Sequence, residues 1–276
     1  MSDAGKQGSQ VVLITGASSG FGLAIGTALA ADGHRVFGGS RHALVEPPPN
    51  FTALTLDVTQ DASIANTIQT ILAHAGSVDV VINNAGVGIA GAIEDTSVAE
   101  AQQQFDTNFF GIHRVCRAVL PQMRAQGRGT LINMSSLGGL VPLPFQAFYS
   151  ASKFAVEAYT DALRMELRPH GIHVSMIEPG DFRTGFTAHR RLTAENTRDS
   201  VYYERCSRAV GRMIADEQKV DDVSPIVNAV KHIISQRRPA LRYPRAAASQ
   251  RLLVALKPFL PQPVFEYLVA DNYGVR

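Results

Sequence analysis

Several residue types that mark particular protein classes are scarce in this sequence. There are only two cysteines, Cys116 and Cys206, ninety positions apart and without CxxC spacing, and there is no tryptophan. This cysteine usage argues against a disulfide scaffold or a structural zinc site and fits a reducing compartment. The eight histidines show no metal-ligand spacing, so no metal is expected. The 26 basic and 24 acidic residues leave a net charge of +2, which gives no reason to expect nucleic acid as a partner.

Long apolar runs are also missing. Residues 1–9 are polar and rich in glycine and serine, which predicts a flexible N-terminus rather than a signal peptide. The most apolar long stretch, residues 252–270, is interrupted by Lys257, Glu266 and three prolines. It is therefore too broken to cross a membrane, but it could cover a pocket or touch a membrane surface from one side. We expect a soluble cytoplasmic protein.

The chain does contain a repeated alternation of strand and helix patterns. Runs of β-branched and apolar residues predict strands at 11–15, 35–39, 52–56, 78–82, 130–134, 172–177 and 241–243. Helical patterns are found at 23–31, 61–75, 97–125, 147–168 and 224–235. The alternation predicts one α/β domain over residues 1–276, a Rossmann-type doubly wound parallel sheet of about seven strands with helices on both faces. Residues 244–276 would form a C-terminal helical extension.

Polar residues indicate where several helices begin. Asp61 and Ser224 are expected N-caps, and Ser97 with Glu100 matches a capping box. The polar segment 185–221 then interrupts the alternation just after a predicted strand, which is typical of a substrate loop or lid. Six arginines within this segment, and Arg183 just before it, could form a solvated face or attract an anionic substrate. The six are Arg190, Arg191, Arg198, Arg205, Arg208 and Arg212.

The first predicted strand runs into a glycine-rich turn with GxxxGxG spacing, followed by a helix. Glycines allow the backbone to turn tightly and to approach a pyrophosphate, which helix N-terminal N–H groups can bind. The alternative is a plain strand-to-helix turn. The nucleotide-binding interpretation assigns cofactor contacts to Gly16, Ser18, Ser19, Gly20, Phe21 and Gly22.

The end of the second predicted strand indicates which dinucleotide binds. An NAD site usually places a carboxylate there, whereas an NADP site places a cation for the 2′-phosphate. This sequence has Ser40 and Arg41, with no acidic residue before Glu46. A guanidinium grips phosphate through paired hydrogen bonds, so Arg41, assisted by Ser18, predicts NADP(H). The alternative is an ordinary surface arginine.

Tyr149 and Lys153 lie four residues apart in a predicted helix and therefore share a face. A nearby ammonium should lower the pKa of the phenol and make Tyr149 a general acid or base. Ser136 lies thirteen residues upstream, where its hydroxyl could bind a substrate oxygen. Asn108 falls inside a predicted helix, a position that needs a reason because asparagine is a modest helix former.

Together these motifs resemble the short-chain dehydrogenase/reductase family. The match covers roughly residues 10–190: TGxxxGxG at 15–22, Asp57-Val58, NNAG at 83–86, then Asn108, Ser136, Tyr149, Lys153, Pro179-Gly180 and Thr184. The resemblance implies catalytic roles for Asn108, Ser136, Tyr149 and Lys153, with Asn108 holding a proton-relay water. It also implies cofactor contacts from Lys153 and Tyr149, and from Ser40, Asp57, Val58, Asn84, Ala85, Gly86, Pro179, Gly180 and Thr184.

Within that family the chain looks most similar to the 17β-hydroxysteroid and retinol dehydrogenase branch. This likeness implies a bulky apolar carbonyl or alcohol substrate, which Ser136 and Tyr149 would contact and which Leu137, Leu143, Phe145, Phe182 and Phe186 could help to enclose. The same residues could instead pack beneath a loop. The family also implies a homodimer or homotetramer through the helices near 100–125 and 147–168. A non-catalytic NADP(H)-binding sensor or scaffold is the alternative function, and a sugar-nucleotide epimerase is disfavoured by the glycine spacing.

Overall fold

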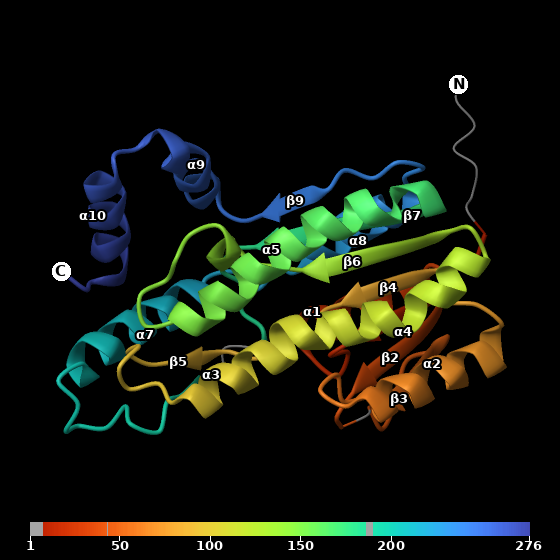
Figure 1. Cartoon of the computed structure of the whole chain (residues 1–276), viewed down its shortest axis with the longest axis horizontal. Helices are drawn as coiled ribbons and strands as arrows, with labels where there is room; N and C mark the ends of the chain where they lie inside the picture. Colours follow the sequence, from red (N-terminus) through yellow and green to blue (C-terminus); the bar gives the residue numbers. More distant parts are fainter. Residues whose placement is uncertain (1–7, 43, 186–189) are drawn as a thin grey trace.

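The computed structural model describes residues 8–42, 44–185 and 190–276. Seven parallel strands form its main sheet, in the order β3-β2-β1-β4-β6-β7-β9 (Figure 1). Strand order reverses between β1 and β4, so the predicted doubly wound Rossmann-type sheet is confirmed. The strands are β1 (Val11–Thr15), β2 (Arg35–Ser40), β3 (Phe51–Thr55), β4 (Val80–Asn83), β6 (Gly129–Met134), β7 (Ile172–Pro179) and β9 (Arg242–Arg245).

Helices cover both faces of this sheet. One face packs against α1 (Gly20–Ala31) and α8 (Ser224–Ser235), the other against α2 (Asp61–Ala75), α4 (Gly111–Ala125) and α5 (Ala147–Leu167). In β1, Val12 and Ile14 belong to the first core, whereas Val11 and Leu13 belong to the second. A strand covered on both faces needs apolar side chains at every position, which explains why the strands appear in the sequence as continuous apolar runs.

The helix predicted at 97–125 is three consecutive segments. The capping box of Ser97 and Glu100 is confirmed at the start of α3 (Val98–Phe105). A single π-helical turn, η1 (Asp106–Phe110), then separates α3 from α4. The local pattern could not predict this interruption, because the apolar spacing continues through it.

Two predicted N-caps were wrong by one residue. Asp61 is the first residue of α2, and the cap position belongs to Gln60. Ser224 is the first residue of α8, and the carboxylate of Asp222 accepts its backbone N–H at 2.8 Å. In the second case an acidic side chain just before the helix accepts the N–H of the first helical residue, Ser224 itself.

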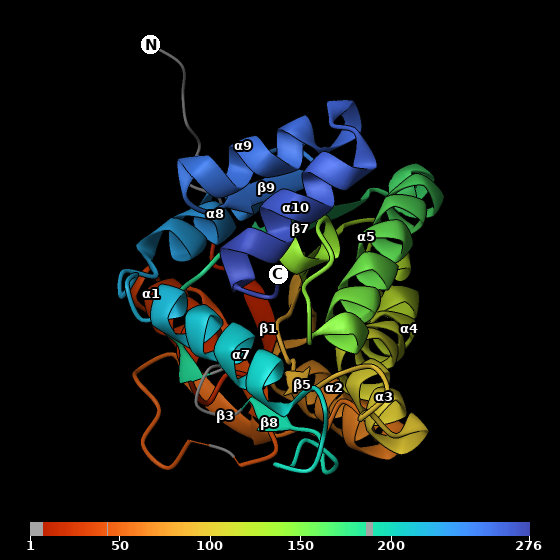
Figure 2. The ribbon, with the colours of Figure 1, turned by 90° about the vertical axis from the view of Figure 1, so that its left-hand side faces the viewer.

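A small sheet and three helices from later in the chain gather at the carboxyl ends of the strands (Figure 2). A two-stranded sheet of β5 (Ile89–Ala90) and β8 (Arg191–Leu192) lies there with α7 (Tyr203–Glu217), α9 (Ala248–Leu256) and α10 (Gln262–Tyr273). Short turns η2 (Leu137–Gly139), η3 (Arg168–His170) and η4 (Lys257–Phe259) complete the described elements. No helix within the described ranges is both long and apolar enough to span a membrane.

The segment predicted as a polar loop contains the helix α7, whose buried side includes Cys206 and Met213. Arg205, Arg208 and Arg212 of this helix donate hydrogen bonds to main-chain carbonyls in residues 271–275, at the end of the chain. Cations near the last carbonyls of a helix stabilise that terminus. These three arginines therefore attach α10 to α7, a role that neither interpretation of the sequence included.

Candidate active site

A cleft of about 1890 Å³ crosses the carboxyl ends of the strands. Its walls come from the turn after β1, the ends of β2, β4 and β7, the helix α5, and the C-terminal helices α9 and α10. The cleft includes the point where strand order reverses between β1 and β4. Open α/β sheets bind their ligands at such a position.

Glycine shapes the turn between β1 and α1. Gly16 has a φ of 68°, and a Cβ on it would lie 2.8 Å from Ala85 Cα. A Cβ on Gly22 would lie 2.3 Å from the carbonyl oxygen of Gly16. No larger residue fits at either position, so the backbone is held close and the N-terminus of α1 faces the cleft. This cradle suits a phosphate group, because helix N-terminal N–H groups attract anions.

The motif at 83–86 holds that turn in place. Thr15 Oγ1 accepts hydrogen bonds from the backbone N–H groups of Asn84 and Ala85, both at 3.0 Å. In return, Asn84 Nδ2 donates to the carbonyl oxygens of Thr15 and Gly16, also at 3.0 Å. Asn84, Ala85 and Gly86 also line the cleft. The loop after β4 is therefore part of the cradle as well as its support.

The predicted adenine end of the site is also assembled. Ser40, Arg41, Asp57 and Val58 all line the cleft. Arg41 is exposed, whereas Ser40 is buried and its hydroxyl donates to the carbonyl of His42 at 2.7 Å. The Asp57 carboxylate bonds within its own turn: Oδ1 accepts hydrogen bonds from the backbone N–H and the hydroxyl of Thr59. The serine thus shapes the loop in which Arg41 stands.

Asn108 lies in the π-helical turn and is fully buried. Its Oδ1 accepts from the N–H of Val87 at 2.8 Å, and its Nδ2 donates to the carbonyl of Val87 at 3.1 Å and to Ser152 Oγ at 3.2 Å. The Ser152 hydroxyl donates onward to the carbonyl of Tyr149 at 2.7 Å. These contacts supply the reason for asparagine at this position, and π turns often occur at functional sites.

Ser136 and Tyr149 meet at the wall of the cleft. A hydrogen bond joins the two side chains, and Ser136 Oγ also accepts from the N–H of Gly138 at 3.0 Å. Burial raises the pKa of Tyr149, and the hydrogen bond with Ser136 opposes this rise without cancelling it. The expected lowering by Lys153 is therefore wrong for this structure, because desolvation of the phenol dominates.

Lys153 is buried beside this pair. Its Nζ donates to the carbonyl oxygen of Met134 at 2.8 Å and lies 5.9 Å from the centre of the Tyr149 ring. Burial lowers the pKa of Lys153 to about 8, and the charge of Glu157 acts in the opposite direction. A Cβ on Gly86 would come within 3.5 Å of Asn108 Oδ1 and 4.0 Å of Lys153 Nζ. All four residues of the predicted tetrad therefore converge on one region.

Comparisons with known proteins agree with this geometry. A family model described as short chain dehydrogenase matches residues 10–195. The chain belongs to the short-chain dehydrogenase/reductase family. This is the oxidoreductase family that the motifs resembled, so the family inferred from the sequence is confirmed.

Individual relatives of this family cover nearly the whole chain. The chain is 38% identical to a 3-ketodihydrosphingosine reductase of Bacteroides thetaiotaomicron, over 97% of this chain and 99% of that protein. It is 35% identical to retinol dehydrogenase 8 of Bos taurus, over 91% and 86% respectively. A short-chain dehydrogenase from Streptomyces avermitilis has a similar structure, with a TM-score of 0.79, 30% identity and 98% of each chain covered. Retinol dehydrogenases are therefore among the relatives, as the motifs indicated.

The remaining predicted contacts are distributed less evenly in this chain. Pro179, Gly180 and Thr184 line the cleft, as do the predicted substrate residues Leu137, Leu143 and Phe182.

Phe145 does not line the cleft. It has a left-handed φ of 59° and packs instead against Ala90, Cys206 and Val210 beneath α7. The packing alternative was therefore correct for this residue, because the turn before α5 directs its ring toward α7. Phe186 lies outside the described residues.

The C-terminal helices contribute to the cleft, which is one of the two roles that the sequence left open for residues 252–270. Leu253 and Val254 of α9, with Leu268 and Val269 of α10, add an apolar wall. One sequence does not show where an unanchored helix will dock. The C-terminal segment therefore lines the cleft, while other apolar side chains of the same segment are exposed, among them Leu252, Leu256, Phe259, Val264 and Tyr267.

A polar group in the same part of the cleft was not predicted from the sequence. Arg190 and Glu217 form a buried ion pair, and Gln250 donates to the carboxylate of Asp181. Burial raises the pKa of Asp181 to about 6. All four residues line the cleft, and the charges of three of them act on Tyr149. Arg190, counted among the arginines of a solvated face, is in fact a buried arginine of the site.

Proposed function

We propose that the protein is an NADP(H)-dependent oxidoreductase that moves a hydride between nicotinamide and a carbonyl or secondary alcohol of a bulky apolar substrate. The observation that carries this proposal is the convergence of Asn108, Ser136, Tyr149 and Lys153 at a cleft with a glycine cradle. A fold kept only for binding would not need a hydroxyl pair and a buried lysine in one place.

The residues of the cleft suit a dinucleotide phosphate. The turn 16–22 and the N-terminus of α1 would hold the pyrophosphate, and Arg41 with Ser18 would hold the 2′-phosphate. Asp57 and Val58 would flank the adenine, Lys153 would bind the nicotinamide ribose, and Pro179, Gly180 and Thr184 would lie near the nicotinamide. When bound, the cofactor supplies or accepts the hydride.

Side chains of the protein would orient the substrate oxygen and transfer a proton to it. Ser136 Oγ would orient the carbonyl, and Tyr149 Oη would donate a proton to its oxygen. Because burial raises the pKa of Tyr149, the phenol keeps its proton at neutral pH. A protonated phenol is the form that reduction needs, and the phenolate is the form that oxidation needs. Lys153 and a water held near Asn108 would replace the proton.

The proposed substrate is a long-chain or polycyclic ketone. Two relatives, a 3-ketodihydrosphingosine reductase and a retinol dehydrogenase, are named for long apolar molecules with oxygen groups. In this chain the apolar wall from α9 and α10 offers matching surface. Oxidation of NADPH, followed by absorbance with a panel of long-chain ketones, steroids, retinoids and aldehydes, tests the proposal. Tight NADPH binding without turnover of any member would favour the alternative, a cofactor-binding sensor or scaffold.

Cofactor choice gives a first prediction. Replacing Ser40 with Asp together with Arg41→Ala removes the proposed phosphate clamp and adds a repelling charge. The preference for NADPH over NADH should fall by roughly ten- to a hundredfold, because hydrogen bonds to charged groups contribute about 1.5–3 kcal/mol. Ratios of kcat/KM for the two cofactors measure this. Arg35→Ala, at the opposite end of β2, is the control and should leave the ratio unchanged. A parent enzyme that prefers NADH would contradict the assignment.

Assembly gives a second prediction. We propose a homodimer or homotetramer that pairs through α4 and α5. Large apolar side chains are exposed in this region, among them Phe110 just before α4 and Met165 on α5, with exposed fractions of 46% and 71%. Such side chains usually gain by burial in an interface. Light scattering at micromolar concentration should give at least twice the chain mass of 29.7 kDa, and a monomer would refute the proposal.

A further inference from the structure

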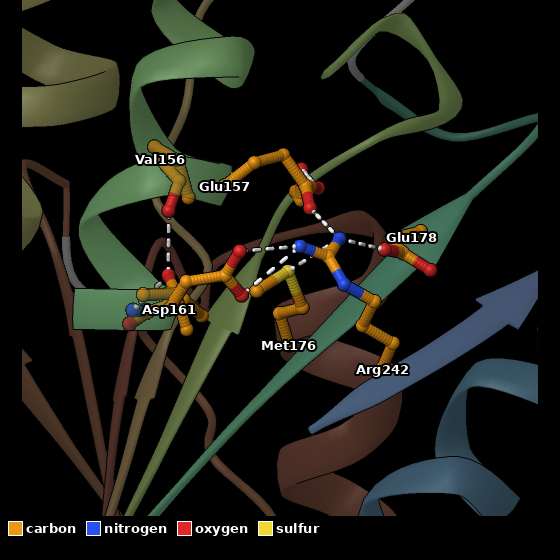
Figure 3. A network of polar contacts seen from close by, with 9 residues as sticks. Val156, Glu157, Asp161, Met176, Glu178 and Arg242 are labelled. Atoms are coloured by element: carbon orange, nitrogen blue, oxygen red, sulfur yellow. Dashed lines mark hydrogen bonds and ion pairs between the residues drawn. The ribbon is translucent and has the colours of Figure 1, made fainter. Parts of the chain in front are cut away.

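A cluster of polar and charged side chains follows Lys153 along α5, and Figure 3 shows the contacts that join Glu157, Asp161, Glu178 and Arg242. We call it the Glu157 cluster; it consists of Ser135, Glu157, Asp161, Glu178 and Arg242. Its members come from the end of β6, from α5, from β7 and from β9. None of the five belongs to the tetrad, and α5 carries Glu157 one helical turn after Lys153.

Arg242 joins the carboxylates of the cluster. Its Nη1 donates to Glu157 Oε2 and, at 2.8 Å, to Glu178 Oε1. Its Nη2 donates to both carboxylate oxygens of Asp161, at 3.0 and 2.9 Å. Ser135 Oγ donates to the other oxygen of Glu157. Glu157 is therefore held from two sides, by a hydroxyl and by a guanidinium.

The two glutamates are buried, whereas Asp161 is half exposed. The side chains of Glu157 and Glu178 are 7% and 2% exposed, and that of Asp161 is 43% exposed. A hydrogen bond also links the two glutamates, and burial raises the pKa of both, to about 7 for Glu157. Such a pair titrates together, and one guanidinium cannot neutralise two buried carboxylates and Asp161 as well.

The main chain connects this cluster to the catalytic side chains. Ser135 lies between Met134, whose carbonyl accepts the Lys153 ammonium, and Ser136. Gly139 packs over the contact: a Cβ there would lie 2.9 Å from Ser135 Oγ and 3.1 Å from Glu157 Cγ. A buried ammonium is costly without a nearby negative charge. Glu157 supplies this charge, and its electrostatic effect on Lys153 favours the ammonium.

We propose that Glu157 is a positioning residue that keeps Lys153 in its ammonium form at the cleft, while Ser135 and Arg242 keep Glu157 in place. The inference rests on the proposed function, in which Lys153 binds the cofactor ribose and supports Tyr149. The charged groups that face Glu157 are Lys153 and Asp161 on its own helix, Glu178 on β7 and Arg242 on β9. Removal of the Glu157 charge should therefore let Lys153 lose its proton at a lower pH.

The test compares the pH dependence of NADPH binding and of turnover in matched variants. In Glu157→Gln, the midpoint above which NADPH affinity and kcat/KM decline should move down by about one pH unit, a typical effect of a nearby opposite charge. Asp161→Asn is the control, because it removes the same charge from the same helix and also loosens Arg242, but lies one turn farther from Lys153. Its midpoint should stay near that of the parent. Glu157→Asp keeps the charge, so its midpoint should lie close to that of the parent.

Fluorescence titration of NADPH gives the binding curve, and circular dichroism checks folding. If Glu157→Gln does not fold, Ser135→Ala replaces it and should shift the midpoint in the same direction by a smaller amount, because Glu157 then keeps its proton to a higher pH. An unchanged midpoint in a folded Glu157→Gln or Ser135→Ala protein would overturn this inference but leave the proposed function standing. Equal shifts in Glu157→Gln and Asp161→Asn would have the same consequence. A parent protein that does not bind NADPH overturns the proposed function and this inference together.

Discussion

Replacing Tyr149 with phenylalanine should lower turnover by about a hundred- to ten-thousandfold, the usual contribution of a general acid. The change removes the hydroxyl that meets Ser136 and keeps the buried ring. NADPH affinity should hardly change, because the glycine turn, Arg41 and Lys153 are untouched. Steady-state kinetics with the best substrate, together with a fluorescence titration of NADPH, separate the two effects.

Tyr159→Phe is the matched control for this experiment. Tyr159 lies on the same helix, but its ring packs against Phe109 and His113 at the side of α4, away from the cleft. Removing its hydroxyl should leave turnover near the parent value. A Tyr149→Phe protein with near-parent turnover would refute the proton-transfer role. The same conclusion would follow if its entire loss came from weaker NADPH binding.

The parts of the site that the sequence predicted are those in which local chemistry determines position. The turn at 15–22 needs glycine because no Cβ fits at Gly16 or Gly22. Tyr149 and Lys153 share a helix face through spacing alone. The strands are continuous apolar runs because both of their faces are covered. At Gly22 and along α5 the reason lies within a few residues of the motif, because a Cβ on Gly22 would meet the carbonyl oxygen of Gly16 and the tyrosine and lysine are one helical turn apart.

The parts that were missed depend on contacts between distant segments. The π-helical turn at Asn108 is held by bonds to Val87 and Ser152. The arginines of α7 bind carbonyls more than fifty residues away, at the end of the chain. The direction of the Phe145 ring depends on a left-handed backbone conformation at a non-glycine residue. No periodicity in one sequence encodes such docking.

The pKa of Tyr149 illustrates the same limit. The spacing to Lys153 correctly predicted that the two residues are neighbours, but the sign of the pKa shift depends on burial, which spacing does not give. In the structure the ammonium bonds the carbonyl of Met134, and desolvation of the phenol is the larger effect. A site motif can therefore be identified before the electrostatics of its members are known.

Replacing Lys153 with methionine should impair two properties at once. NADPH affinity should fall by roughly ten- to a hundredfold, since a hydrogen bond from a charged group contributes about 1.5–3 kcal/mol. Turnover at saturating NADPH should fall as well, because Tyr149 loses the cation that supports its proton exchange. Lys257→Met is the control: that lysine also donates to a main-chain carbonyl, of Leu140, but lies outside the tetrad. It should leave NADPH affinity unchanged.

Thermal unfolding distinguishes a functional lysine from a structural one. Burial lowers the pKa of Lys153 from 10.5 to about 8, so the folded protein releases this proton more readily than the unfolded chain. The buried ammonium therefore costs stability below pH 8, and this cost disappears as the pH rises to about 10.5. At pH 7 the Lys153→Met protein should unfold at the parent temperature or above it, with an advantage that shrinks between pH 8 and 10.5. Lower activity combined with a lower unfolding temperature at pH 7 would instead identify Lys153 as a residue that the fold requires.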